Sequence, residues 1–284
     1  MKNYIYAIAI LSLFSGCAKE EVKAPVQEKA KVNLENMKLI KGGKFLMGTK
    51  EDSYGDKFLH TVEVSDFYID ITEVTNNDNF PMVNISYNEA LSYCKKQGKT
   101  LPTEAQWEYA ARGGMSSKLY PWGDEKNTAL LNDRDSNLFK AKEVKSYMPN
   151  AYGLYEMSGN VREWVLDSYS KDFYRLSDSK NPINKEVTTM KVTRGGSFDY
   201  SNGYPATVAF RSFDNDEAKY DDLGFRCAYI GKEDIKAVTK TKVERKNQKK
   251  EKKQKSEKSM LKKTSSNISE AAKTKKDAES LFKW

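Results

Sequence analysis

Residues 194–212, RGGSFDYSNGYPATVAFRS, bring together the side chains of this chain that are best suited to hold a ligand. The stretch contains Arg, Tyr, Ser, Asn and Asp but neither Cys nor His, so it lacks a thiolate nucleophile and an imidazole base. Rigid aromatic rings beside adaptable polar groups are typical of recognition surfaces. The stretch therefore indicates a binding surface more than a catalytic centre.

Six residues of this stretch are candidates for a binding cleft: Ser197, Asp199, Tyr200, Asn202, Tyr204 and Arg211. The alternative is that the Tyr and Arg side chains pack over a loop-rich core. An enzyme would need a nucleophile beside a base, or converging carboxylates. Five Asp residues lie between positions 199 and 222, but their spacing fits no hydrolytic pattern.

The first residues predict export and lipidation. Residues 1–3 give a short cationic start and residues 4–14 an apolar run too short to span a bilayer, so residues 1–16 are predicted to be a signal peptide. The small residues before Cys17 resemble the lipobox of bacterial lipoproteins, which implies acylation of Cys17 and a place in the bacterial cell envelope. Ala18 favours the outer membrane, because inner-membrane retention often uses Asp there. The alternative is an ordinary secretory signal with an incidental Cys.

Both ends differ in composition from the middle of the chain. Residues 17–34 are charged and poor in large apolar groups, which predicts a tether. Residues 233–284 are Lys-rich, and we expect a disordered tail. Within it, residues 235–284 carry 17 Lys and Arg against 6 Asp and Glu, a net charge of +11, whereas the whole chain carries +8. Such a tail is either simply solvated or bound to an anionic surface. Export and the scarcity of aromatic side chains in the tail argue against nucleic acid.

Residues 35–232 are long enough for one domain with its own core. Two helices are predicted, one over residues 86–97 with a capping box from Ser86 and Glu89, and one over residues 103–113 capped by Thr103. The second helix has a compact face of Ala105, Trp107, Ala110 and Ala111. Strands are predicted at KFLMGT, HTVEVSDFYID, KVTRGGSF and LGFRCAYI, where apolar and polar residues partly alternate.

Several motifs in residues 37–230 resemble, in order and spacing, the formylglycine-generating enzyme or sulfatase-modifying factor family. They are GGKFLMGT, HTVEVSDFYIDITEVTN, FPMVNISYNEALSYCKKQGKTLPTEAQWEYAARGG, YPWGD, PNAYGLYEMSGNVREWVLD, RGGSF and DDLGFRCAYI. The resemblance implies an α+β, loop-rich C-type-lectin-like fold with small sheets and few helices. Family members usually have a longer segment after EVTN, so part of the cleft layer is shortened here.

The family's redox chemistry does not carry over. Catalytic members oxidise a sulfatase cysteine to formylglycine with two copper-binding cysteines, and these positions match Tyr200 and Pro205, neither of which can supply a thiolate. Another branch binds iron through several histidines, whereas this chain has one, His60. We therefore expect neither copper nor iron, and interpret His60 as structural.

The resemblance also implies two structural features. Cysteines that match Cys94 and Cys227 are joined in family members, so a disulfide is expected in an oxidising compartment, with two free buried thiols as the alternative. A structural calcium ion is expected at the residues that match Glu156, Gly159, Val161 and Glu163, the middle two through backbone carbonyls. The alternative is a capped turn without an ion. A second calcium site is implied near residues 132–135, in a loop that is shortened here.

The sequence thus favours a lipid-anchored, non-catalytic member of this family, either a binding protein or a structural component of an envelope complex of the gliding or secretion type. Its partner would be an envelope protein, a peptide or a glycan. The alternative is an enzyme with a different, copper-free chemistry in the cleft near residues 194–226.

Overall fold

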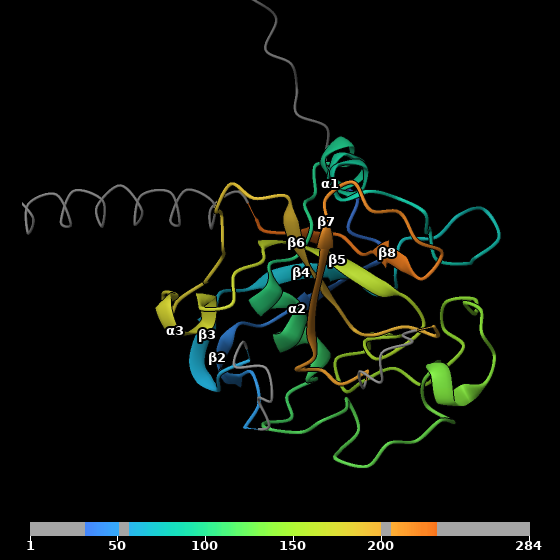
Figure 1. Cartoon of the computed structure of the whole chain (residues 1–284), viewed down its shortest axis with the longest axis horizontal. Coiled ribbons are helices and arrows are strands. Elements are labelled where there is room, and N and C mark those ends of the chain that lie inside the picture. The colour runs from blue at the N-terminus through green and yellow to red at the C-terminus, as the bar shows by residue number, and fades with distance from the viewer. Residues whose placement is uncertain (1–31, 51–56, 200–205, 232–284) are drawn as a thin grey trace, which may run out of the picture. The chain divides into compact units, whose positions relative to one another are not determined.

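The structure is a computed structural model that describes residues 32–50, 57–199 and 206–231 (Figure 1). The predicted signal peptide, the lipidation site Cys17, most of the tether and the Lys-rich tail lie outside the described residues. So do the cleft candidates Tyr200, Asn202 and Tyr204.

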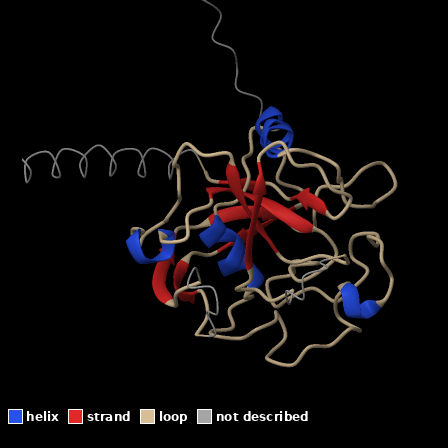
Figure 2. Ribbon diagram, in the orientation of Figure 1, coloured by secondary structure: helices blue, strands red, loops and turns tan. Residues whose placement is uncertain are grey.

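Small sheets surrounded by long loops make up the described residues, which confirms the α+β, loop-rich fold (Figure 2). A four-stranded sheet has the order β7-β6-β5-β8, a three-stranded sheet the order β1-β4-β9, and β2 pairs with β3. All pairs are antiparallel except β5 with β8. The strands are β1 (Met37–Ile40), β2 (Gly43–Met47), β3 (His60–Val64), β4 (Phe67–Asp70), β5 (Arg162–Ser168), β6 (Met190–Arg194), β7 (Arg211–Asn215), β8 (Leu223–Phe225) and β9 (Ala228–Tyr229).

The two predicted helices form as α1 (Tyr87–Lys96) and α2 (Glu104–Ala111), and short helical turns follow at η1 (Arg134–Ser136) and α3 (Phe173–Leu176). Both predicted N-caps are confirmed. Ser86 and Thr103 accept the backbone N–H three residues on, while the side chains of Glu89 and Gln106 accept the N–H of the cap residue. Each capping box satisfies two donors that a helix start leaves free.

Helix α2 is buried on almost every side, because it packs against strands of two different sheets (Figure 1). Its predicted apolar face is confirmed, since Ala105, Trp107, Ala110 and Ala111 are at most 1% exposed. The carboxylates of Glu104 and Glu108 on the same helix are equally buried. A buried charge needs a partner, and arginines from the strands supply one.

Arg194 at the end of β6 is the main partner of these carboxylates. Its guanidinium donates to Glu104 Oε1 at 2.9 Å and to Glu108 Oε2 at 2.7 Å, and it lies over the ring of Trp107. Arg112 donates to Glu108 Oε1 at 2.7 Å. Burial opposes ionisation of Glu108, but the two arginines hold its pKa below the usual range. These ion pairs join α2 to the four-stranded sheet.

Candidate functional site

The Arg211 side chain is interior, so the prediction that it lines a binding cleft is wrong. Arg211 is 3% exposed, and its Nε–H donates to Glu104 Oε1 at 2.8 Å. The guanidinium also lies over the rings of Tyr169 and Tyr174. Strand β7 turns this residue toward α2, where Arg211 and Arg194 together bind the same oxygen of the buried Glu104 carboxylate.

Ser197 is also buried, at 1% exposed, and belongs to a polar network instead of an open cleft. Its Oγ–H donates to Asp222 Oδ2 at 2.6 Å, and Arg162 binds both oxygens of Asp222 at 2.9 and 3.0 Å. A serine whose hydroxyl already donates to a carboxylate has no imidazole to activate it, because the single His60 of the chain lies on β3. Of the described cleft candidates, only Asp199 is exposed.

His60 is held by packing, as the sequence predicted. Its Nδ1 lies 2.8 Å from the carbonyl oxygen of Phe58, and its ring lies between those of Phe58 and Tyr174. Among the described residues, no group of three or more His, Cys, Asp and Glu side chains could hold a metal ion. The ring contacts with Phe58 and Tyr174 support the interpretation of His60 as a structural residue.

The expected disulfide is present. Cys94 of α1 and Cys227, just before β9, form it with a Cα–Cα distance of 5.7 Å. Both cysteines lie in a second apolar cluster with Trp164 and Phe225, apart from the cluster around α2. Because Cys94 and Cys227 are the only cysteines between residues 35 and 232, the disulfide leaves no thiol in this domain.

The implied calcium ligands fit only in part. The Glu163 carboxylate does not fit: Arg226 donates to both of its oxygens at 2.8 Å, and Trp107 Nε1–H donates to Oε2 at 2.8 Å. Glu156 does fit, because its Oε1 is buried and has no hydrogen-bond partner among the described residues. The backbone of Glu156 has φ +50°, a left-handed conformation that Asn or Gly would adopt at lower cost.

The second implied calcium site contains an ammonium group. Lys126 Nζ forms ion pairs with both Asp133 and Asp135, at the start of η1. Those two carboxylates therefore already share an ammonium group of the chain itself, which occupies the place between them that a calcium ion would need.

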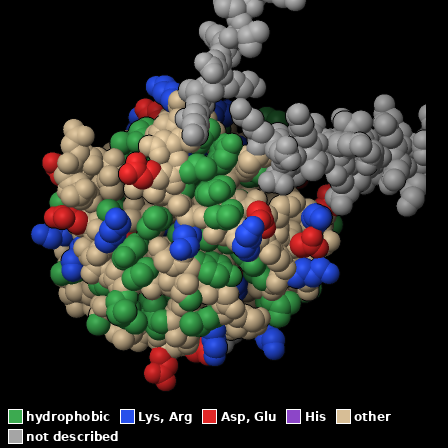
Figure 3. Space-filling view, turned by 180° about the vertical axis from the view of Figure 1, so that it is seen from behind, with side chains coloured by type: hydrophobic (Ala, Val, Ile, Leu, Met, Phe, Trp, Pro, Cys, Tyr) green, Lys and Arg blue, Asp and Glu red, His purple; other side chains and the backbone are tan. Residues whose placement is uncertain are grey.

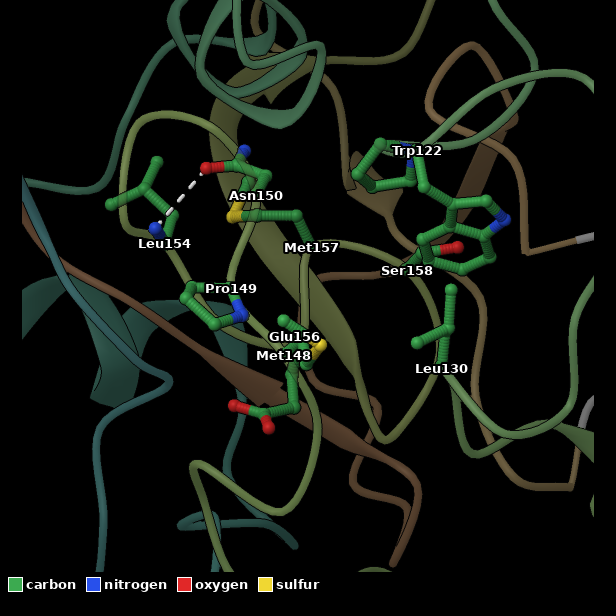
Figure 4. Close-up of a pocket in the computed structure, with 10 residues that line it drawn as sticks. Trp122, Leu130, Met148, Pro149, Asn150, Leu154, Glu156, Met157 and Ser158 are labelled. Carbon is green, nitrogen blue, oxygen red and sulfur yellow. Dashed lines mark hydrogen bonds between the residues drawn. The ribbon is translucent and has the colours of Figure 1, made fainter.

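A pocket of about 170 Å³ opens among the loops between residues 121 and 158. Figure 4 shows Trp122, Leu130 and Ser158 on one side, Pro149 and Leu154 on the other, and Met157 between them. A cavity of about 150 Å³ lined by apolar side chains holds a benzene ring. This pocket is therefore large enough for one aliphatic or aromatic side chain.

Apart from Glu156 Oε1, which has no hydrogen-bond partner among the described residues, the polar side chains around this pocket form hydrogen bonds within the protein. Trp122 Nε1–H donates to the Glu125 carbonyl at 2.9 Å, and Ser158 Oγ–H donates to the Ala206 carbonyl. The Asn150 amide donates to Ala110 O at 2.8 Å, and its oxygen accepts from Leu154 N at 3.1 Å. A ligand here thus meets apolar surface and few free hydrogen-bonding groups. Met148 at its edge is 77% exposed.

Sequence reasoning did not find this pocket, because its lining comes from loop residues without a helical or strand period. The YPWGD motif was noted only as part of the resemblance. Two aromatic residues of this motif, Tyr120 and Trp122, could have indicated a binding site, and in the structure their rings stack with centroids 5.2 Å apart.

The small sheets, the long loops and the disulfide between Cys94 and Cys227 define a formylglycine-generating-enzyme-like domain. The sequence matches the family described as sulfatase-modifying factor enzyme 1-like domain over residues 22–80 and 76–230, and the chain belongs to this family.

Two relatives and one solved structure show how similar the chain is to other proteins. The chain is 37% identical over 174 residues to the formylglycine-generating enzyme of Streptomyces coelicolor, covering 55% of each chain. It is 37% identical over 164 residues to the inactive C-alpha-formylglycine-generating enzyme 2 of Bos taurus, covering 52% of this chain and 50% of that one. It also resembles the structure of PvdO from Pseudomonas aeruginosa, with a TM-score of 0.58, 25% identity and coverage of 68% and 93%. The chain spans about half the length of these two relatives.

Proposed function

We propose that this protein is a non-catalytic, lipid-anchored binding component of the bacterial cell envelope, built on a formylglycine-generating-enzyme-like domain. The observation that carries this proposal is the disulfide between Cys94 and Cys227. The family's oxidation chemistry needs a pair of thiolates, and the domain has no cysteine left to supply them. A relative whose name describes it as inactive supports a family in which the fold is kept without the chemistry.

The binding site in this proposal is the apolar pocket lined by Trp122, Leu130 and Met157. Apart from Glu156 Oε1, its polar neighbours form hydrogen bonds within the protein, so an apolar side chain of a protein or peptide suits it better than a glycan, which needs several free donors and acceptors. Charged side chains of both signs are interspersed over the face shown in Figure 3, so no single-sign patch on that face competes with the pocket. A partner would insert one anchoring side chain, as hot spots of interfaces do.

The envelope location in this proposal rests on the sequence. A lipid on Cys17, with the outer membrane favoured, would hold the domain at a membrane surface, and the Lys-rich tail would bind an anionic surface nearby. No helix among the described residues is long and apolar enough to cross a membrane. The partners in view are therefore envelope proteins and peptides rather than nucleic acids.

Photocrosslinking in the native organism tests the binding role. A photoreactive amino acid at Met148, on the pocket edge, is compared with one at the exposed Val187, which does not line the pocket. We expect an envelope protein to be crosslinked from position 148 only, and the crosslink to disappear with Trp122→Ala. Failure to find any such crosslink, together with conversion of a sulfatase-peptide cysteine to formylglycine by the purified chain, would show that the protein is an enzyme.

A further inference from the structure

Two apolar side chains, Leu138 and Phe139, lie next to each other in the loop that follows η1 and are exposed to solvent. Leu138 is 39% exposed and Phe139 is 60% exposed. In the view of Figure 1 this green loop runs along the edge of the domain opposite to α3. Single exposed apolar side chains are common on soluble proteins, whereas contiguous apolar surface marks a place where another molecule binds.

The backbone on both sides of this pair is fixed by hydrogen bonds. Before the pair, Asn137 ends η1 in a left-handed conformation and donates its N–H back into the turn. After the pair, the Lys140 carbonyl accepts from the side chain of Asn132 at 2.9 Å, and the Lys142 N–H donates to the side chain of Asn160 at 2.9 Å. Both of these last asparagines are fully buried. The domain therefore holds the two apolar side chains in place at its surface.

Phe139 adopts a backbone conformation that a large side chain rarely takes. Its φ is +50°, in the left-handed region, where the Cβ crowds the following carbonyl oxygen. Such strain persists only where the surrounding structure imposes it, and it is concentrated at functional sites. By contrast, the exposed Phe213 lies in the regular strand β7 and stacks on Tyr169 with ring centroids 3.9 Å apart. Folding stability alone does not explain a strained backbone that keeps an aromatic ring in water.

Lysines follow the exposed pair along the chain. Residues 137–148 contain three Lys and one Glu, a net charge of +2. Lys140 comes directly after the pair and is exposed, as is Lys145, and Lys142 is half-buried with its Nζ 5.0 Å from the centroid of the Tyr147 ring. Proteins that bind a membrane surface combine such groups, because the apolar side chains enter the boundary between headgroups and acyl chains while ammonium groups bind anionic headgroups.

We propose that the loop of residues 137–148 inserts Leu138 and Phe139 into the surface of an anionic phospholipid bilayer. The proposal rests on the envelope location in the proposed function, but not on the pocket or its partner. A bilayer accepts two neighbouring apolar side chains beside lysines without a matching cavity, whereas a protein partner has to supply one. A lipid on Cys17 would keep the domain within reach, since residues 18–31 span at most about 50 Å when fully extended.

Fluorescence quenching by the bilayer tests the insertion. The mature chain, residues 17–284, carries Cys17→Ser so that no lipid is attached, and is mixed with vesicles of phosphatidylglycerol and phosphatidylethanolamine whose acyl chains are brominated. Phe139→Trp introduces an indole at the loop, and Phe213→Trp is the matched control, because Phe213 is also exposed, at 42%. We expect the bromine atoms to quench the added fluorescence of Phe139→Trp and to leave that of Phe213→Trp unchanged.

Equal quenching in these two variants, or no quenching in Phe139→Trp, would overturn the proposal. Because the protein carries no lipid and no partner is present, neither outcome depends on the acylation of Cys17 or on a ligand in the pocket. Failure of the insertion is therefore distinguishable from failure of the proposed binding role.

Sedimentation with the same vesicles measures the affinity of the unlipidated chain. In about 0.5 M NaCl the attraction of the Lys-rich tail for anionic lipid is largely screened. Replacing both Leu138→Ser and Phe139→Ser should lower the partition coefficient at least tenfold, because two apolar side chains no longer leave water on binding. Phe213→Ser should leave it unchanged. An unchanged partition of the double variant would contradict the proposal. So would a wild-type dimer that the double variant converts to a monomer, since a second copy would then cover the pair.

Phe139→Asn separates presentation to lipid from a merely structural role. Asn adopts the left-handed conformation at lower cost than Phe, so the melting temperature should rise while the partition into vesicles falls. A Phe139 that only stabilises the fold would give a lower melting temperature instead. That result, or a partition that stays at the wild-type value, would refute the proposal.

Discussion

Asp167 on β5 makes stability depend on pH in a way that can be measured. The carboxylate is fully buried and accepts backbone N–H groups from Glu104 at 2.8 Å and from Asn184 at 2.7 Å. Burial, followed by the charge of Glu104, raises the pKa of Asp167 from 3.8 to about 7, while Arg211 acts in the opposite direction. Burial, followed by the charge of Asp167, raises the pKa of the neighbouring Tyr87 to about 12.

The sign follows from the raised pKa. Between about pH 4 and pH 7 the unfolded chain loses this proton and the folded protein keeps it, so the free energy of unfolding falls as pH rises. Each pH unit costs about 1.4 kcal/mol, and the whole window roughly 4 kcal/mol. Above pH 7 the effect is constant, and below pH 4 it disappears.

Asp167→Asn isolates this effect, because it removes the titrating group from both states. The amide of the variant can accept only one of the two backbone N–H groups that the carboxylate accepts. The resulting loss of stability is the same at every pH. Urea unfolding at pH 4.5, 5.5, 6.5 and 7.5 should therefore give a difference between wild type and variant that changes by about 1.4 kcal/mol per pH unit up to pH 6.5 and by roughly half as much over the last step. The exposed Asp172→Asn serves as the control. A difference that stays flat across these pH values would refute the reasoning.

Three further outcomes are expected. Reducing the disulfide should lower the free energy of unfolding by at most about 5 kcal/mol, since it closes a loop of 133 residues; urea unfolding with and without reductant measures this. Arg226→Met should cost about 3–5 kcal/mol in the same assay, because it leaves the Glu163 carboxylate buried without a cation. Gly159→Ala should destabilise far more than Gly153→Ala in thermal unfolding: both glycines have φ near +80°, but only at Gly159 would the new Cβ lie 2.5 Å from a backbone oxygen, that of Asn132. Equal decreases in melting temperature for the two variants would show that the positive φ angle, and not the contact with Asn132, causes the destabilisation.

The helices were predictable because their signals are local. The capping boxes at Ser86 and Thr103 act over three residues, and both formed as expected. Strand β7 was not predicted, because it owes its existence to pairing with β6 and has no clear alternation of its own. Strand β5 was not predicted either, since its residues were interpreted through the calcium motif that precedes them.

The buried charges of α2 show where sequence periodicity fails. A pattern of apolar residues identified the face with Trp107, and the same pattern assigns Glu104 and Glu108 to solvent. In the structure these glutamates are buried because Arg194 lies beside them, 90 and 86 positions away in the chain. A single sequence does not reveal which charges over such a separation are partners, whereas the resemblance to a family fixes the fold that brings them together.

The composition of residues 194–212 did not show which of its polar side chains stabilise the interior and which are free to bind a ligand. Its arginines neutralise the carboxylates of α2, and Ser197 donates to Asp222, so most of its described polar groups stabilise the interior. Its lack of Cys and His still predicts that the thiolate chemistry of the family does not occur in this stretch. Composition alone could not locate a binding surface, since an arginine that pairs with a buried glutamate and one that awaits a ligand look the same in a sequence. Only burial distinguishes the two kinds of arginine. Because Arg211 is buried, a ligand is expected not at this residue but in the pocket of the loops that carry Trp122.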